Sequence, residues 1–439
     1  MTEVERAFAE DTRFQKMLDV EAALARAEAQ AGIIPASAAK AISRASRAER
    51  FDVTTIVADA HSAGNLAIPL VKALTRLVAD DSPESSRYVH WGATSQDIID
   101  TGLVLQLRDA VPIVVRDLRR AASAAATHAR LHARTPMPGR TWLQQATPIT
   151  FGLKAAGWLD ALVRTMEGLE SALTGALCLQ FGGASGTLAS LGADGLNVSS
   201  RMGALLNLPV PALPWHAHRD RLATLACALG VSCGTMGKIA RDVALLGQTE
   251  IQEAIEPSAD AGGSSTMPHK RNPVRAARVL SAAVRAPGLV AAMLSAMPQE
   301  HERGLGGWQA EWDVLPELVR VTASAATSTA DLLERLIVRN EAMERNLQMT
   351  QGLIMAESVV MALAPHVGKS TAHGLVDRAA RRALDEGVSF ADALAQDPEI
   401  TRSLGPGALA DALEPADYLG VSAQFVARVL AATDSKTKA

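Results

Sequence analysis

The chain has 439 residues, a formal net charge of −4 and a sequence pI near 6.2. This balance gives no basic surface of the kind that binds nucleic acid or anionic membranes, and the length suggests two or three domains. The three cysteines, at positions 178, 227 and 233, lack C-x-x-C spacing, which argues against a disulfide framework or a zinc site. We expect buried, inert thiols. We also expect no cofactor and no metal, because no phosphate-binding loop, dinucleotide motif or His-Glu-x-x-His run occurs.

Apolar residues recur at helical spacing along most of the chain, beginning with a helix that ends near residues 32–35. Hydrophobic residues make up 48% of the chain and aromatic residues only 3%, so alanine and leucine must fill the interior between closely packed helices. A second apolar seam covers residues 103–118, with a kink expected at Pro112. Further long helices are predicted over residues 151–176, 219–250 and 311–335, the last interrupted at Pro316.

After about residue 339 the pattern changes to shorter helices separated by Gly368, Gly387 and the turn at residues 405–407. We therefore divide the chain into an N-terminal helical domain (1–102), a central bundle of long helices (103–340) and a C-terminal helical domain (341–439). Long helices with short connections favour an all-α bundle, and their apolar surface exceeds what one chain can cover, which predicts an oligomer.

Two further features of the sequence bear on location. No apolar run approaches the ~18 residues needed to cross a bilayer. The first residues lack the basic-then-apolar layout of a signal peptide. We therefore expect a cytoplasmic protein.

One polar segment interrupts the helical pattern and is the most informative run in the chain. Residues 262–273 read GGSSTMPHKRNP. Paired glycines, paired serines and a Met-Pro step predict a mobile loop, and Pro273 favours the first turn of a following helix. Lys270, Arg271 and Asn272 gather just before that turn. A hydroxyl-bearing loop that leads into a cationic helix start suits closure over a small carboxylate, and the alternative is a flexible linker with a chance Lys-Arg pair.

This segment closely resembles the signature loop of the fumarase/aspartase superfamily, and two other segments extend the resemblance along nearly the whole chain. Residues 89–97 (VHWGATSQD) are similar to the first signature segment, and residues 139–148 (GRTWLQQATP) to the second. Within the superfamily, the likeness is greatest to the bacterial 3-carboxy-cis,cis-muconate cycloisomerase family. The features that indicate this are residues 181–188 (FGGASGTL), 298–303 (PQEHER) and 351–353 (QGL).

The resemblance implies a three-domain, all-α fold in which long central helices of four subunits form the core of a homotetramer. It also implies active sites shared between subunits, each built from the three signature segments. In that family the first serine of the loop is the general base, which corresponds to Ser264. Lys270 and Asn272 carry over as groups that hold a substrate carboxylate and the anionic intermediate. For Ser264 the structural alternative is a turn-forming hydroxyl.

The first segment resembles the part of the family that binds a substrate carboxylate, which places Thr94, Ser95 and Gln96 at the site. Two hydroxyls beside backbone N–H groups at a helix start suit an anion. An ordinary helix N-cap is the alternative, and both can hold at once. His90 is expected near this pocket, although a lone histidine is more often structural.

The second segment contributes Thr141, Trp142 and Gln145 to the predicted substrate site. Related C–N lyases carry a histidine, the candidate general acid, where this chain has Trp142. An indole N–H cannot shuttle protons near neutral pH, whereas a carboxylate leaving group needs no such help. Trp142 therefore fits intramolecular carboxylate chemistry, with an aromatic core residue as the alternative. Gln145 departs from many relatives, which have histidine there, and this puts a proton-handling role at that position in doubt.

Three further polar residues are candidates for the substrate's third carboxylate: Arg219, His301 and Arg303. Arg219 belongs to a polar cluster that opens the long helix predicted from residue 219. His301 and Arg303 lie in a His-Glu-Arg run, for which solvated surface is the usual reading.

Together with the resemblance, these features predict a cofactor-independent cycloisomerase that interconverts 3-carboxy-cis,cis-muconate and its carboxymuconolactone. The resemblance implies a place in the protocatechuate branch of aromatic degradation (the β-ketoadipate pathway). The small polycarboxylate substrate and further copies of the chain are the expected partners. Two alternatives remain open at this stage. One is another lyase of the same fold, such as an adenylosuccinate-type C–N lyase that releases fumarate. The other is a catalytically silent helical oligomer.

Overall fold

The structure is a computed structural model that describes residues 1–257, 267 and 270–437. The chain forms two compact units. Unit 1 comprises Met1–Asp117, Thr165–Gly234 and Ser281–Thr327, and unit 2 comprises Leu118–Arg164, Thr235–Leu280 and Ser328–Ala439. The borders fall inside the five longest helices after residue 90, so each unit receives part of every one of them. These helices are α7 (Ser95–Leu131), α8 (Phe151–Ala176), α10 (Asp220–Leu246), α11 (Val274–Ala296) and α12 (Gly307–Glu334).

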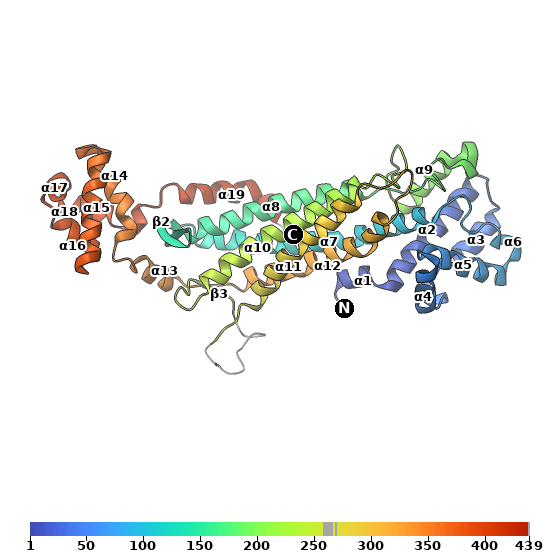
Figure 1. Cartoon of the computed structure of the whole chain (residues 1–439), viewed down its shortest axis with the longest axis horizontal. Coiled ribbons are helices and arrows are strands. Elements are labelled where there is room, and N and C mark those ends of the chain that lie inside the picture. Colours follow the sequence, from blue (N-terminus) through green and yellow to red (C-terminus); the bar gives the residue numbers. More distant parts are fainter. Residues whose placement is uncertain (258–266, 268–269, 438–439) are drawn as a thin grey trace. The chain divides into compact units, whose positions relative to one another are not determined.

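The remaining elements of unit 1 are mostly short helices around the longer α2 (Figure 1). They are α1 (Glu3–Ala7), α2 (Glu10–Gln30), α3 (Ala36–Ala45), η1 (Ala48–Arg50), α4 (Val53–Ala63), α5 (Ala67–Asp81), α6 (Pro83–Ser86), η2 (Ala189–Asp194) and α9 (Gly195–Leu206).

Unit 2 adds two small antiparallel sheets and a set of short helices. The strands are β1 (Pro136–Thr141), β2 (Gln144–Thr150), β3 (Ala254–Ile255) and β4 (Ile337–Val338), paired as β1–β2 and β3–β4. The helices are α13 (Asn340–Leu347), η3 (Leu353–Met355), α14 (Ala356–Val367), α15 (Lys369–Glu386), α16 (Phe390–Ala395), α17 (Pro398–Ser403), α18 (Pro406–Ala412), η4 (Pro415–Asp417) and α19 (Ser422–Thr437).

The long helices follow the predicted apolar seams, which confirms the all-α fold. Helix α8 covers the predicted range 151–176, and α10 begins and ends within a few residues of its prediction. The expected interruption at Pro316 is wrong, because α12 continues through it. Proline removes one N–H from the helix, but the neighbouring Leu315 and Leu318 are fully buried, and this packing offsets the lost hydrogen bond. Helix α7 also continues through Pro112, where the predicted kink stays a prediction.

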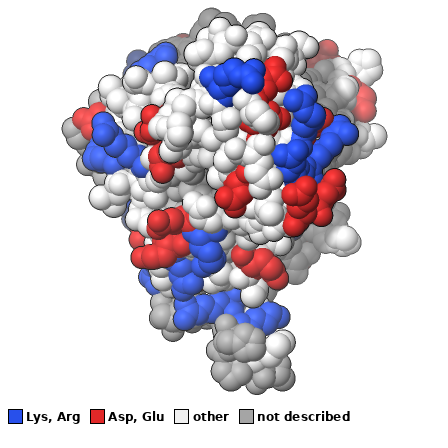
Figure 2. Space-filling model, turned by 90° about the vertical axis from the view of Figure 1, so that its left-hand side faces the viewer, with Lys and Arg blue, Asp and Glu red and all other residues white. Residues whose placement is uncertain are grey.

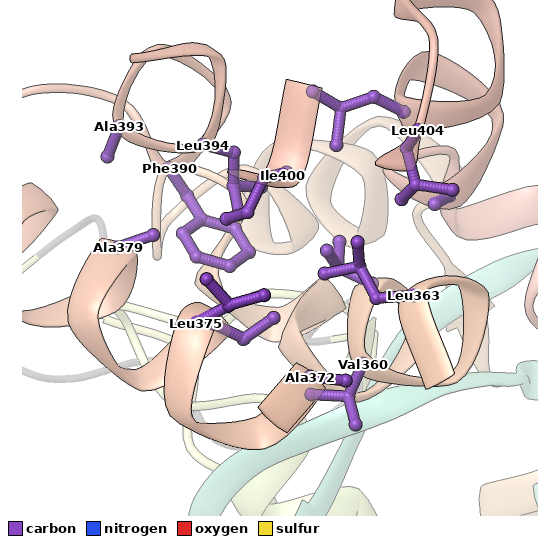
Figure 3. Packing of buried hydrophobic residues seen from close by; sticks show 14 of the residues in the cluster. Val360, Leu363, Ala372, Leu375, Ala379, Phe390, Ala393, Leu394, Ile400 and Leu404 are labelled. Atoms are coloured by element: carbon purple, nitrogen blue, oxygen red, sulfur yellow. The ribbon is translucent and has the colours of Figure 1, made fainter. Parts of the chain in front are cut away.

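The short helices after residue 352 enclose a separate apolar cluster (Figure 3). Leu363, Leu375, Phe390 and Ile400 are fully buried there and come from α14, α15, α16 and α17. Burial of each such side chain contributes roughly 1.5–3 kcal/mol. Glycine and proline between these helices allow the sharp turns that bring the four side chains together.

Two helices in the described part of the chain, α10 and α11, are long and apolar enough to pass a length-and-composition test for a membrane span. The sequence was expected to hold no apolar run of about 18 residues. The length-and-composition test also admits an 18-residue window that contains up to two charged residues, and both helices meet it. The core helix of a soluble protein passes the same test. Within the chain, 56% of the α10 window is buried but only 28% of the α11 window.

Of the three cysteines, Cys178 and Cys233 are buried as expected, while Cys227 is half-buried. Burial raises the pKa of the Cys178 and Cys233 thiols above the ordinary value, which keeps both protonated and unreactive.

Candidate functional site

The first signature segment leads into the N-terminus of α7 in unit 1. His90 has a positive φ of 59°, and its Nδ1 lies 2.6 Å from Oε1 of Glu21, a buried residue of α2. Burial opposes a charged imidazole, but the charge and hydrogen bond of Glu21, with the charge of Asp97, together raise the pKa of His90. The structure therefore pairs His90 with a buried carboxylate that favours the protonated imidazole, while its role at the substrate site stays a prediction.

Asp97, in the first turn of α7, organises this segment. Its carboxylate accepts the backbone N–H of Thr94 at 3.0 Å and contacts Nε2 of His216 at 2.7 Å. It also accepts the N–H groups of Gly182 and Gly183, at 2.9 and 3.0 Å. A carboxylate that satisfies four partners at once fixes the first segment against the loop at residues 181–188.

The glycines of that loop permit the close approach. Gly183 has a φ of 68°, and a Cβ there would lie 3.0 Å from the carbonyl oxygen of Gly92. Gly92 itself has a φ of 74°. Residues 181–188 were expected to mark the family, and in the structure their backbone N–H groups hold Asp97 of the first signature segment.

Thr94 and Ser95 are half-buried at the start of α7, where the helix dipole favours an anion. Gln96 is fully buried instead. Its amide nitrogen donates to Asp100 at 3.1 Å and to the carbonyl of His216 at 3.0 Å. This location makes Gln96 a support for the segment and does not favour direct contact with substrate.

Arg219 is also buried, at 2% exposure, which sequence reasoning did not anticipate. Its guanidinium donates to both oxygens of Asp100, at 2.7 and 3.2 Å, and to both oxygens of Glu311. Burial opposes the charge, but the two carboxylates hold the pKa of Arg219 above its ordinary value. Trp308 adds an indole hydrogen bond to Asp100 at 2.9 Å. The position does not favour the expected contact with a substrate carboxylate, because carboxylates of the same chain already surround the guanidinium.

His301 and Arg303 lie in the turn before α12. His301 is exposed with a φ of 48°, as the surface reading predicts. Arg303 donates to the carbonyl of Ala184 at 2.7 Å and is half-buried. The structure therefore brings Arg303 to the loop at residues 181–188, while the substrate role of both residues stays a prediction.

The second signature segment is the β1–β2 hairpin of unit 2. Thr141 pairs with Gln144, and Trp142 and Leu143 between them have φ angles of 53° and 65°. Two left-handed residues make the tight turn that suits the twist of a hairpin. Trp142 is 98% exposed, so the alternative that it is a core residue is wrong. An indole at a hairpin tip exposes apolar surface to water, which is unfavourable. The position suggests that Trp142 has a function outside the core of its own chain.

Gln145 follows on β2 and points back into unit 2. Its amide nitrogen donates to the carbonyl of Asn346 at 3.1 Å. Across the hairpin, Arg140 forms a two-pronged ion pair with Glu253, at 2.8 and 2.6 Å. Glu253 is fully buried and also accepts the side-chain amide of Asn346 at 2.8 Å. Sequence reasoning did not select Glu253, because nothing in the run before the loop distinguishes it from its neighbouring acids.

The third segment is described at Met267 and from Lys270 onward, while Ser264 lies outside the described residues. Lys270 and Asn272 line a cavity of about 800 Å³ within unit 2, together with Arg271, Arg339 and Glu256. Figure 2 shows several Lys and Arg side chains close together in the lower part of the view, with Asp and Glu side chains beside them. A cavity that carries three cations suits a substrate with several carboxylates.

A single carboxylate anchors the helix that follows these residues. Glu256 accepts the backbone N–H of Arg275 at 2.9 Å and that of Ala276 at 3.3 Å, in the first turn of α11. The Arg275 guanidinium adds an ion pair at 3.1 Å. Pro273 has no side-chain acceptor, so Glu256 supplies the cap that this helix lacks.

Comparison with known proteins agrees with this geometry. A family model described as lyase matches residues 2–288, and one described as adenylosuccinate lyase C-terminus matches residues 352–429. The chain therefore belongs to this lyase family, within the fumarase/aspartase superfamily.

Individual relatives cover nearly the whole chain. A 3-carboxy-cis,cis-muconate cycloisomerase of Pseudomonas aeruginosa is 50% identical over 97% of this chain and 93% of its own length. The crystal structure of the 3-carboxy-cis,cis-muconate lactonizing enzyme of Pseudomonas putida superposes with a TM-score of 0.94 at 46% identity, covering 99% of this chain and 97% of that one. A nitrosuccinate lyase of Streptomyces davaonensis is 40% identical over 99% of this chain and 93% of its own length.

Proposed function

We propose that this chain is a cofactor-independent cycloisomerase that interconverts 3-carboxy-cis,cis-muconate and its carboxymuconolactone. The observation that carries the proposal is the 50% identity, over 97% of the chain, to an enzyme of that name. The nitrosuccinate lyase is less similar, at 40% identity over 99% of the chain. The cationic cavity at Lys270 fits a substrate with three carboxylates.

The chemistry requires a base and a site that stabilises negative charge. In the direction of ring opening, the base removes a proton from the carbon beside a carboxylate, and a carbon–carbon double bond forms. The electron pair of that C–H bond, held on the neighbouring carboxylate in the anionic intermediate, then expels the lactone oxygen, so that the C–O bond breaks and releases a carboxylate within the same molecule. In the direction of ring closure, that carboxylate oxygen adds to the conjugated alkene, and the adjacent carbon takes up the proton.

We assign these tasks to the third segment. Ser264 is the base, and Lys270 and Asn272 stabilise the charge that builds up on the carboxylate next to the departing proton. The compact ammonium of Lys270 is suited to a concentrated charge, and the amide of Asn272 supplies oriented N–H donors. Both residues line the cavity in the described part of the loop.

The hairpin tip distinguishes this reaction from C–N cleavage. An amine leaving group must be protonated as it departs, and Trp142 at the tip has no proton to give near neutral pH. A carboxylate leaves without protonation because its conjugate acid has a pKa of about 4. The solvent-exposed Trp142 therefore supports an internal carboxylate as the leaving group.

The active form is proposed to be a homotetramer with shared active sites. Helix α11 leaves Val284 77% exposed and Leu294 45% exposed, which is apolar surface that further copies of the chain would cover. The exposed Trp142 is equally suited to reach a site on another subunit. A cytoplasmic location and a place in the protocatechuate branch of aromatic degradation complete the proposal.

Ultraviolet spectroscopy tests the substrate assignment directly. Purified protein should remove the absorbance of the conjugated diene of 3-carboxy-cis,cis-muconate, and Ser264→Ala and Lys270→Met should each abolish this without loss of assembly. Unchanged absorbance with the native chain would reject the proposal. Release of fumarate from adenylosuccinate, or turnover of nitrosuccinate, would establish a C–N lyase in its place.

A further inference from the structure

Two buried carboxylates, Glu253 and Glu256, stand three residues apart in the segment that precedes the signature loop. Neither belongs to the three signature segments. Glu253 holds the second segment through Arg140, and Glu256 holds the helix start that directly follows the third. Glu253 is fully buried and Glu256 is 6% exposed, so both charges depend on the partners that surround them. All these partners belong to unit 2.

The backbone between them is fixed independently of their side chains. Ala254 and Ile255 form β3, which pairs with β4 in an antiparallel register. The carbonyl of Glu253 accepts the N–H of Arg339 at 2.9 Å, and its own N–H donates to the carbonyl of Leu246 at 3.0 Å. This short strand is therefore a rigid base, and side chains that follow one another along a strand point to opposite faces.

Glu253 reaches the hairpin. Its two oxygens meet the two terminal nitrogens of Arg140 in a parallel arrangement, which fixes both distance and orientation. Arg140 lies opposite Gln145 in the hairpin register and directly before Thr141 and the turn. The carboxylate therefore sets where the tip with Trp142 stands.

Glu256 reaches the start of α11, with contacts of two kinds. The contacts to the N–H groups of Arg275 and Ala276 are backbone contacts, so they hold the helix start whatever side chains it carries. The ion pair with the Arg275 guanidinium is a side-chain contact. Asn272 lies three residues before Arg275, and Lys270 five, so the position of the helix start sets the position of both.

We propose that Glu253 and Glu256 are positioning residues, which fix the second and third signature segments to one short strand. The inference rests on the proposed function, because it assigns their task to that reaction. Glu256 would act on Lys270 and Asn272, and Glu253 on the hairpin tip. Since Glu253 directly precedes β3 and Glu256 directly follows it, a displacement of this strand would move the hairpin and the start of α11 together.

Three single variants separate this role from a general effect of lost charge. Glu256→Gln keeps the shape but replaces one acceptor oxygen with an N–H₂ group that faces backbone donors. It should lower kcat for 3-carboxy-cis,cis-muconate at least tenfold while KM changes less. Arg275→Ala removes only the ion pair and should stay within threefold of the native rate. Glu250→Gln, at an exposed position three residues before Glu253, is the matched control and should match the native enzyme.

For Glu253 the test is a double-mutant cycle with Arg140. Glu253→Gln and Arg140→Gln should each reduce kcat/KM about tenfold, and the double variant should lose little more than either single one. Fully additive losses would overturn the assignment of Glu253 to the hairpin. Equal activity of Glu253→Gln and Glu250→Gln would do the same.

Amide hydrogen exchange gives a measurement that does not depend on the substrate. In Glu256→Gln the amides of Arg275 and Ala276 should exchange faster than in the native chain, and in Arg275→Ala they should stay protected. Unchanged exchange in Glu256→Gln overturns the role of Glu256. If the native chain does not convert carboxymuconate, the proposed function fails. The exchange measurement still shows whether Glu256 holds the start of α11. If Glu256→Gln does not assemble, Glu256→Asp provides the test. Its amides at positions 275 and 276 must exchange faster, and its kcat must be lower, than those of Arg275→Ala. If Glu256→Asp behaves like Glu250→Gln, the proposal is refuted.

Discussion

Asp97 and His216 are joined by a 2.7 Å contact between a carboxylate oxygen and Nε2, and both side chains are buried. They come from positions 119 residues apart, and the contact ties the start of α7 to the chain just before α10. The Asp97 carboxylate also accepts hydrogen bonds from three backbone N–H groups, so its neighbours are donors that need a carboxylate oxygen as acceptor. A buried donor left without its acceptor costs about 1–3 kcal/mol.

Asp97→Asn should therefore destabilise the chain although it is nearly isosteric. The new amide group would face donors that previously met a carboxylate oxygen, so the free energy of unfolding should fall by about 3 kcal/mol. Guanidinium unfolding at fixed protein concentration measures this. Asp109→Asn, on the same helix at an exposed carboxylate that pairs with the half-buried Lys16, is the control and should change stability by less than about 1 kcal/mol. Equal losses in the two variants would contradict this account of Asp97.

Arg219→Met tests whether this arginine is structural. Removing the guanidinium leaves Asp100 and Glu311 buried and close together without their cation, which should cost about 3–5 kcal/mol. Differential scanning calorimetry should show a lower Tm. Arg44→Met, at a surface pair with Asp81, should cost less than about 1 kcal/mol. If Arg219→Met raised KM without lowering Tm, the original expectation of a substrate ligand would be right.

The helices were predictable because their signal is local. Every third or fourth residue along 151–176 is apolar, and the structure places a helix there. The β1–β2 hairpin was missed because a Trp-Leu pair lacks the Asn-Gly or Gly-Gly signal of such turns. Chemistry at the three segments could be predicted from their resemblance to a family, but the tasks of Arg219 and Gln96 could not. Gln96 and Arg219 both bind Asp100 in the interior, and Arg219 also binds Glu311. Glu311 lies 92 residues from Arg219, and sequence spacing carries no information over that separation.

Trp142→Ala should separate activity from stability. The side chain is 98% exposed, so its removal should change the free energy of unfolding by less than about 0.5 kcal/mol. If the hairpin tip enters the active site of another subunit, kcat/KM should still fall at least tenfold. Leu131→Ala, at a 71% exposed position of α7, is the control and should alter neither quantity. Full activity of Trp142→Ala would remove the tip from the proposed site.

Glu28, on α2, predicts an unusual dependence of stability on pH. Neither carboxyl oxygen has a hydrogen-bond partner among the described residues, and burial, aided by the charge of Glu21, raises the pKa of Glu28 to about 9. A carboxyl group with a raised pKa in the folded chain stabilises it most below the ordinary pKa of 4.5, and this stability is lost as the pH rises from 4.5 towards 9. The loss is about 1.4 kcal/mol per pH unit, or about 3 kcal/mol at pH 7.

Glu28→Gln removes the titration and keeps the shape of the side chain. The variant should match the native chain near pH 4.5 and exceed its stability by about 3 kcal/mol at pH 7, as measured by guanidinium unfolding at several pH values. Glu10→Gln, at an exposed position on the same helix, should follow the native chain at every pH. The raised pKa of His90 makes a contribution of the same sign, since a histidine with a raised pKa stabilises the fold below about pH 6.5 and less as the pH rises. The His90 contribution is present in the native chain and in Glu28→Gln, so it cancels in the difference between their free energies of unfolding. If that difference did not grow with pH, Glu28 would be charged in the folded protein.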